Sequence, residues 1–199
     1  MKKILLLVSI LTLTNYVSAV SSSAAPTLIP ATGTIEVAFS PNNGVTQTVV
    51  NAINNANKRI LVEAYSFTSK DISAALLSAK KRGVEIQLIL DKSQVGRKYS
   101  SATFFSNLGF NLHIDINHAI FHDKVMIIDA NTVITGSFNF TKAAETKNAE
   151  NLLILRGNTQ LTKLYTKEFV YNWQQSLSYN DYLNSKYFKP KEKNNNYFE

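Results

Sequence analysis

The chain has 199 residues, a formal net charge of +7 and no cysteine. This length suits one domain with a sizeable hydrophobic core, and the missing cysteines exclude disulfides, thiolate nucleophiles and thiolate metal ligands. The positive charge favours a polyanionic partner such as nucleic acid, although modest basicity is also common in exported proteins that bind none.

The first 19 residues have the three parts of a secretory signal peptide. Lys2 and Lys3 begin it, residues 4–13 are mostly apolar, and small residues end it at Ala19. Cleavage after Ala19 would lower the net charge to +5 and place the protein in the periplasm or outside the cell. The apolar run is short for a membrane span, so we expect no stable membrane association after cleavage, with an uncleaved anchor as the alternative. Residues 20–32 are rich in Ser, Ala, Pro and Thr and predict a flexible leader.

Strand and helix patterns alternate through residues 33–180, which we assign to one domain. The expected strands are 34–39, 59–67, 84–90, 110–116 and 150–156, and the expected helices are 45–56, 71–82, 99–108, 141–146 and 159–176. This order predicts the α/β class, with a mixed β-sheet sandwiched by helices. Residues 181–199 are polar, and we expect a tail that packs loosely or frays.

A β-hairpin is expected around Asp129-Ala-Asn-Thr132, which has the composition of a turn. A two-residue loop would pair Lys124 with Ser137 and His122 with Asn139, on one face of the hairpin. Four polar side chains would then surround a phosphate-sized space. A three-residue loop or a bulge would break these pairings.

These residue types suit phosphodiester chemistry. Imidazole can attack phosphorus or protonate a leaving oxygen, while lysine and neutral donors bind the non-bridging oxygens. The same strand parity places Asp129 on the other face, so we interpret it first as a turn-former whose carboxylate accepts backbone N–H bonds.

The pattern H-x-K-x4-D-x6-G-S-x-N over residues 122–139 resembles the signature of the phospholipase D superfamily, with every fixed position present. The short length and single motif look most like the small bacterial endonucleases of that superfamily. The resemblance implies a phospholipase D-like fold, a phosphohistidine intermediate and no metal or other cofactor.

The resemblance also implies roles for individual residues. His122 would be the nucleophile or the acid, and phosphate would be bound by Lys124, Ser137 and Asn139. Asp129 belongs to the signature and so counts among the candidate catalytic residues beside its structural interpretation. The segment 148–151 looks like the family's downstream element, which makes Glu150 a candidate to orient His122.

The family's typical enzymes carry two copies of the motif, whereas this chain has one and no internal repeat. One active site needs two histidines in opposite roles. We therefore expect a homodimer in which both copies of His122 share a site on the two-fold axis. Two imidazoles side by side in one site would repel each other when both are charged, so the two histidines would take up their protons at different pH values.

A metal site is the main rival interpretation. His118 and His122 are four residues apart, which on a helix would place both on one face, and Asp115 or Asp123 could complete the ligand set. The flanking sequence is rich in strand-forming residues, which argues against a helix. A serine hydrolase is disfavoured because no Gly-x-Ser-x-Gly occurs.

Two further groups of residues could extend a substrate path. Residues 65–68 lie at the end of the expected strand 59–67, where aromatics could stack on bases, but we favour ordinary core packing for Tyr65 or Phe67. Basic runs at 80–82 and 92–98 could follow a phosphate backbone or form solvated faces. The leading interpretation is an exported endonuclease that cleaves DNA with little sequence preference and accepts RNA as a second substrate. A phospholipase or phosphatidyl transferase is the alternative, and a nucleic-acid-binding protein without turnover is disfavoured by the complete signature.

Overall fold

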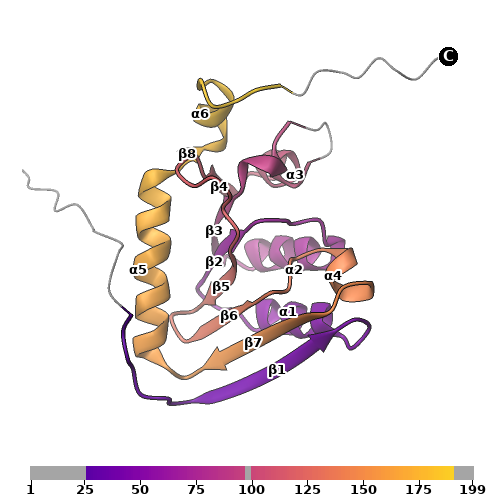
Figure 1. Cartoon of the computed structure of the whole chain (residues 1–199), viewed down its shortest axis with the longest axis vertical. Coiled ribbons are helices and arrows are strands. Elements are labelled where there is room, and N and C mark those ends of the chain that lie inside the picture. Colours follow the sequence, from indigo (N-terminus) through magenta and orange to yellow (C-terminus); the bar gives the residue numbers. More distant parts are fainter. Residues whose placement is uncertain (1–25, 97–99, 191–199) are drawn as a thin grey trace, which may run out of the picture.

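The computed structural model describes residues 26–96 and 100–190 (Figure 1). The predicted signal peptide, residues 1–19, lies outside this range. Residues 26–32, the described part of the expected leader, form no helix or strand and are mostly exposed. No helix within the described part of the chain has the length and apolar character needed to cross a membrane.

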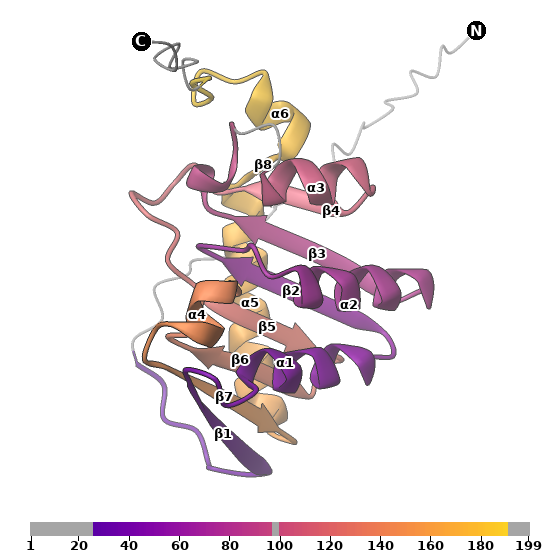
Figure 2. The same ribbon diagram turned by 90° about the vertical axis from the view of Figure 1, so that its right-hand side faces the viewer.

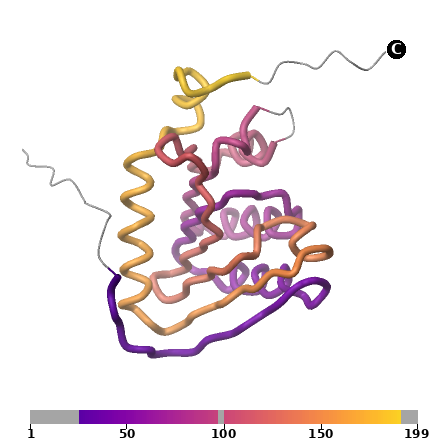
Figure 3. Tube along the Cα trace, in the orientation of Figure 1, coloured from indigo at the N-terminus to yellow at the C-terminus, as the bar shows by residue number. Residues whose placement is uncertain are grey.

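The described strands form a single mixed sheet with the order β1-β7-β6-β5-β2-β3-β4-β8. Their bounds are β1 Thr34–Ser40, β2 Arg59–Ala64, β3 Glu85–Leu90, β4 Asn111–Ile114, β5 Lys124–Ile128, β6 Thr132–Gly136, β7 Glu150–Arg156 and β8 Leu177–Ser178. Strands β2, β3 and β4 are parallel to one another, and the other neighbouring pairs are antiparallel. The first strand thus pairs with a late one, as the indigo and orange segments of the trace show (Figure 3).

Helices cover both faces of this sheet (Figures 1 and 2). Their bounds are α1 Val45–Asn54, α2 Lys70–Lys81, α3 Ser101–Asn107, α4 Lys142–Thr146, α5 Thr159–Gln175 and α6 Tyr179–Leu183, with a short 3-10 helix at Lys92–Gln94. Helices α1, α2 and α3 lie on one face, and α5 crosses the other (Figure 2). The predicted α/β class, with a mixed sheet between helices, is confirmed.

The apolar pattern of the central strands follows from burial on both faces. In β2, Ile60 and Val62 belong to the large core under α1 and α2, whereas Leu61 belongs to a smaller core under α5. A strand covered on both sides needs a continuous apolar run rather than an alternating one. Glu63 interrupts this run on the α5 face, where it is only 3% exposed.

The predicted hairpin register is wrong by one residue. Met126 pairs with Ile134 and Ile128 pairs with Thr132, so the loop contains three residues rather than two. Asp129 and Ala130 both adopt left-handed backbone conformations, with φ of 53° and 56°. Continued beyond its last pair, this register would set Lys124 level with Gly136 rather than Ser137.

The chain's end also differs from the prediction. Residues 181–199 were expected to form a loose tail, but Tyr182 of α6 is 4% exposed and belongs to the main core. Phe188 packs against the same core. The domain therefore extends past residue 180, because aromatic side chains anchor an otherwise polar segment; residues 191–199 lie outside the described range.

Candidate active site

Both halves of the motif lie at one edge of the sheet. β2 ends at Ala64, directly opposite Lys124, the first residue of β5. β6 ends at Gly136, opposite Leu152 near the start of β7. We call this edge, formed by Ala64, Lys124, Gly136 and Glu150, the motif edge. It lies at the carboxyl ends of the parallel strands, where α/β sheets commonly place their sites.

His122, Lys124 and Tyr65 form a compact cluster at the motif edge. The Lys124 ammonium nitrogen, Nζ, lies 3.0 Å from Nδ1 of His122 and donates to the His122 carbonyl oxygen at 2.7 Å. The Tyr65 ring centroid lies 4.6 Å from that of His122 and 5.2 Å from Lys124 Nζ. Core packing is correct for Phe67, which is fully buried, but Tyr65 belongs to the site. The position of Tyr65 just beyond a parallel strand was the available signal.

The electrostatics of this cluster follow from burial. Lys124 is 6% exposed, whereas His122 is exposed. Burial lowers the pKa of the Lys124 ammonium, and the Asp123 and Glu150 carboxylates offset only part of this effect. A charged ammonium only donates hydrogen bonds, so Nδ1 of His122 accepts, and the proton of a neutral imidazole then lies on Nε2.

A β-bulge shapes the second half of the motif. The N–H groups of Ser137 and Phe138 both donate to the Asn151 carbonyl, at 3.1 and 3.2 Å. In return, the Ser137 hydroxyl accepts from the Asn151 backbone N–H at 3.1 Å and from its side-chain amide at 3.3 Å. Asn151 was not among the predicted site residues; its signal was the position next to Glu150.

Backbone crowding explains the glycine of the motif. A Cβ atom at Gly136 would lie 2.3 Å from the Asn151 carbonyl oxygen, and the φ of Gly136 is +152°. Phe138 is fully buried in the main core, which fixes the backbone between Ser137 and Asn139. The side-chain oxygen of Asn139 is buried without a hydrogen-bond partner among the described residues.

The four residues expected around one phosphate lie near the motif edge, but not in the cross-strand pairs Lys124–Ser137 and His122–Asn139 that were predicted. No hydrogen bond within the described residues joins His122 or Lys124 to Ser137 or Asn139. The shifted register and the bulge account for this difference.

Glu150 begins β7 at the same edge. Its carboxylate accepts from the Asn148 side chain at 3.0 Å and is close enough to Lys124 to raise that residue's pKa. Among the described residues the Glu150 carboxylate is hydrogen-bonded to Asn148, so orientation of His122 by Glu150 stays a prediction.

Asp129 lies at the opposite end of β5. Its carboxylate accepts the backbone N–H groups of Asn57, Lys58 and Arg59 at 2.7, 2.7 and 2.9 Å. Burial raises the pKa of Asp129, but these hydrogen bonds outweigh it and the net shift is downward. The geometry thus supports the turn-forming interpretation, and no contact among the described residues links Asp129 to His122 or Lys124.

Comparison with known proteins agrees with this geometry. The family model described as "Cardiolipin synthase, PLD-like domain" matches residues 49–173. The chain belongs to the phospholipase D superfamily. A "Phospholipase D" of Rickettsia conorii is 37% identical over 139 residues, covering 70% of this chain and 67% of the relative.

Two solved structures share the fold. Nuc from Salmonella typhimurium, a phospholipase D family member, has 39% identity and a TM-score of 0.69, covering 74% of this chain and 99% of Nuc. NucT from Helicobacter pylori has 22% identity and a TM-score of 0.64, covering 73% of this chain and all of NucT, and supports the fold alone. The predicted family is confirmed, and this superfamily member is a phosphodiesterase.

The rival metal interpretation loses its geometric basis. Residues 117–123 form no helix, and His118 Nδ1 instead contacts the buried Asp115 carboxylate at 3.1 Å. Among the residues that the structure describes, no three His, Asp or Glu side chains are grouped as metal ligands.

Proposed function

We propose that this superfamily member is an endonuclease that cleaves DNA with little sequence preference, with RNA as a second substrate. The observation that carries the proposal is the His122–Lys124 contact at the motif edge, which joins a potential nucleophile to a phosphate-binding cation. The likeness to Nuc over nearly all of that chain supports it. A site that grips phosphate rather than bases would accept many sequences.

In the proposed reaction, Nε2 of His122 attacks phosphorus, a P–N bond forms and the P–O bond to the leaving oxygen breaks. An imidazolium gives its proton to that oxygen. The resulting imidazole then takes a proton from water, which attacks phosphorus and breaks the P–N bond. Because Nδ1 accepts from Lys124 before substrate binds, the substrate phosphate must first draw Nζ away. The proton of His122 can then lie on Nδ1, with Glu150 as its acceptor.

The acid in this scheme is His122 of the partner subunit, so the active unit is a homodimer. An apolar face suited to this contact lies on β1, where Ile35, Val37 and Phe39 are 61, 52 and 59% exposed. Helix α5 covers the central part of the sheet, where it packs against β2, β5 and β6. Phe39 pairs with Asn151, which binds Ser137, so the apolar face is continuous with the motif edge.

A lipid phosphodiesterase or phosphatidyl transferase is the second candidate. The curated relatives named "Phospholipase D" favour it, and the same histidine chemistry would act on a lipid phosphodiester.

The deciding experiment incubates purified protein with plasmid DNA and with phosphatidylcholine vesicles, both in excess chelator. We expect nicked and linear plasmid, intact lipid, and no cleavage by a His122→Ala variant. Lipid turnover without DNA cleavage would replace the first candidate by the second. Loss of activity in chelator, restored by one divalent ion, would reject the metal-independent mechanism.

We also propose export to the periplasm or the medium, on the signal-like pattern of residues 1–19. N-terminal sequencing of protein from fractionated cells should find a chain that begins at Val20. An intact Met1 on protein in the cytoplasmic fraction would contradict export.

A further inference from the structure

Two adjoining pockets lie beside the motif edge and share a wall made by Thr68 and Lys70. The first has a volume of about 400 Å³ and lies between the starts of α2 and α4, where Lys142 and Glu145 line it. The second has a volume of about 460 Å³ and lies between α2 and α3, where Leu77 and Phe104 line it. The proposed phosphodiester chemistry does not use either pocket.

Both pockets are lined by chain segments that lead away from the motif edge. The segment that carries Tyr65 into the site runs on to Thr68 and Ser69, whose N–H groups both donate to the Phe140 carbonyl at 2.9 Å. The segment that carries Asn139 runs on to Phe140 and then to α4, which begins at Lys142. A chain molecule bound at the motif edge would therefore meet Lys70 and Lys142 next.

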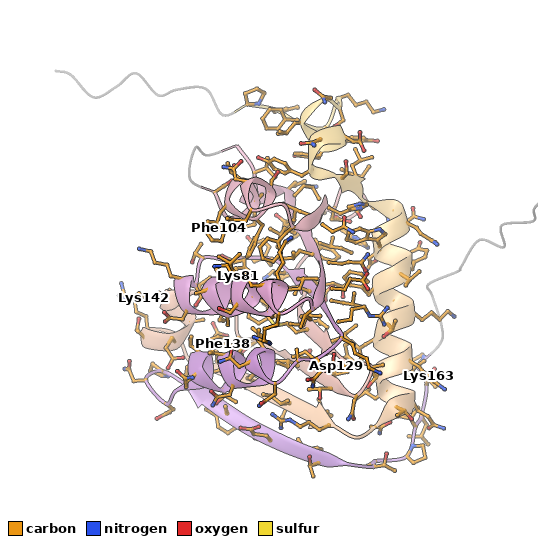
Figure 4. All side chains as sticks on the ribbon, turned by 180° about the vertical axis from the view of Figure 1, so that it is seen from behind. Lys81, Phe104, Asp129, Phe138, Lys142 and Lys163 are labelled. Atoms are coloured by element: carbon orange, nitrogen blue, oxygen red, sulfur yellow. The ribbon has the colours of Figure 1, made fainter. Side chains whose placement is uncertain are left out.

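The first pocket offers uncompensated positive charge. Lys70 and Lys142 are exposed, and neither forms an ion pair within the part of the chain that the structure describes. Figure 4 shows Lys142 at the side of the molecule away from Asp129 and Lys163. Such lysines can bind a phosphate without first giving up another partner.

The acidic residues of this pocket are weak competitors for those lysines. Both carboxylate oxygens of Glu145 already accept backbone N–H groups, from Gly44 at 3.0 Å and Thr46 at 2.6 Å. Asp71 lies in the first turn of α2, where the N-terminal end of the helix offsets its charge. The Asp71 carboxylate still repels a bound phosphate. Removing its charge should therefore strengthen phosphate binding, whereas removing the lysines should weaken it.

The second pocket adjoins the first at Thr68 and Lys70 and offers an apolar surface. The Phe104 side chain is 43% exposed, and its ring is held at 5.4 Å by an edge-on contact with Phe105. Leu77 of α2 is partly exposed in the same pocket. A fixed, half-exposed aromatic ring beside a cationic pocket suits a nucleobase.

We propose that these pockets bind the nucleotide that flanks the scissile phosphodiester. Lys70 and Lys142 hold its phosphate, and Phe104 and Leu77 hold its base. This subsite rests on the proposed nuclease function and deepens it, because it selects a strand with repeated phosphates over a phosphatidylcholine headgroup that has one.

The test compares two substrates, a labelled single-stranded 12-nucleotide DNA and bis(p-nitrophenyl) phosphate, across a series of salt concentrations. The small diester has no flanking phosphate, so its turnover reports on the chemical site alone. For the Lys70→Ala/Lys142→Ala variant we expect the KM for the oligonucleotide to rise roughly tenfold. The slope of log binding constant against log salt concentration should become shallower by about one to two, the contribution of one to two phosphate contacts. Turnover of the small diester should change less than twofold. Asp71→Asn should lower the oligonucleotide KM.

A Lys163→Ala/Lys167→Ala variant is the matched control, because it removes the same charge from α5. If both double variants raised the oligonucleotide KM equally, the cause would be a general loss of electrostatic attraction to DNA, and the subsite would be overturned. Equal losses on both substrates by Lys70→Ala/Lys142→Ala would also overturn it, because they would place the lysines in the support of the chemical site. Wild-type protein that hydrolyses the small diester and vesicle lipid but no oligonucleotide would reject the nuclease proposal itself, and the subsite with it.

Discussion

At the scale of single residues, two charged side chains of the motif serve different purposes at the two ends of β5. Lys124 is a buried cation whose hydrogen bonds go to His122 at the motif edge. Asp129 is a carboxylate whose hydrogen bonds go to backbone N–H groups at the far end. The motif contains both residues, but position in the sheet separates the residue suited to chemistry from the residue that holds the fold.

Asp129→Asn should therefore cost stability more than turnover. An amide has one acceptor oxygen and cannot serve three N–H donors as a carboxylate does, so we expect a loss of about 1–3 kcal/mol in the free energy of unfolding. Urea denaturation measures this loss, and turnover per folded molecule should stay near that of the wild type. A stable variant with a lost rate would assign Asp129 to the chemistry.

Glu63 gives a pH-dependent prediction. Burial raises its pKa to about 8, and its carboxyl accepts from Asn172 at 2.9 Å. Below pH 4.5 the carboxyl is protonated in both folded and unfolded chains; as the pH rises toward 8, only the unfolded chain ionises, so the folded state loses stability.

Glu63→Gln should remove this contribution while keeping an acceptor for Asn172. The variant's advantage in unfolding free energy over the wild type should grow between pH 5 and pH 8. Chemical denaturation at several pH values provides the measurement. Parallel pH curves for the two proteins would show that Glu63 ionises normally in the fold.

At the scale of elements, the bulge between β6 and β7 controls the second half of the motif. Gly136→Ala would force a Cβ atom to within 2.3 Å of the Asn151 carbonyl oxygen, so the strands must separate. We expect a loss of more than about 1 kcal/mol in stability, together with lost activity. Gly83→Ala is the control, since Gly83 also has a positive φ but no atom within 4 Å of its added Cβ. Equal destabilisation by both would mean that backbone conformation alone matters.

Local patterns predicted most elements because they report burial directly. The apolar run of β3 is an example. The hairpin register depended on whether Ala130 adopts a left-handed conformation, which no residue preference indicates. Helix α6 was missed because Tyr182 is its one buried side chain in a polar segment, and that burial comes from distant contacts.

The candidate site, like the fold, was predicted where local sequence patterns carry the information. His122 and Lys124 were found from spacing, and the structure brings them into contact. Tyr65 and Asn151 lie outside the motif itself, and their contacts depend on the sheet order and on the bulge. Tertiary arrangement, rather than local sequence, selects these two residues.

At the scale of the whole molecule, dimerisation through β1 can be tested directly. Static light scattering should give twice the mass of one chain, and Val37→Glu should give one chain and no plasmid cleavage, because a buried charge opposes association. Leu108→Glu is the control, as Leu108 is 36% exposed at the end of α3. A fully active Val37→Glu monomer would remove both the apolar contact and the shared site.

The pairing of β1 with β7 sets an order of assembly. Ser40 pairs with Glu150 and Phe39 with Asn151, so the first strand has no partner until the last part of the motif edge has been made. Helix α1 likewise receives its N-terminal acceptor from Glu145. The sheet is therefore complete only when the first strand and the last long strand of the domain meet, and the His122–Lys124 segment cannot close it alone.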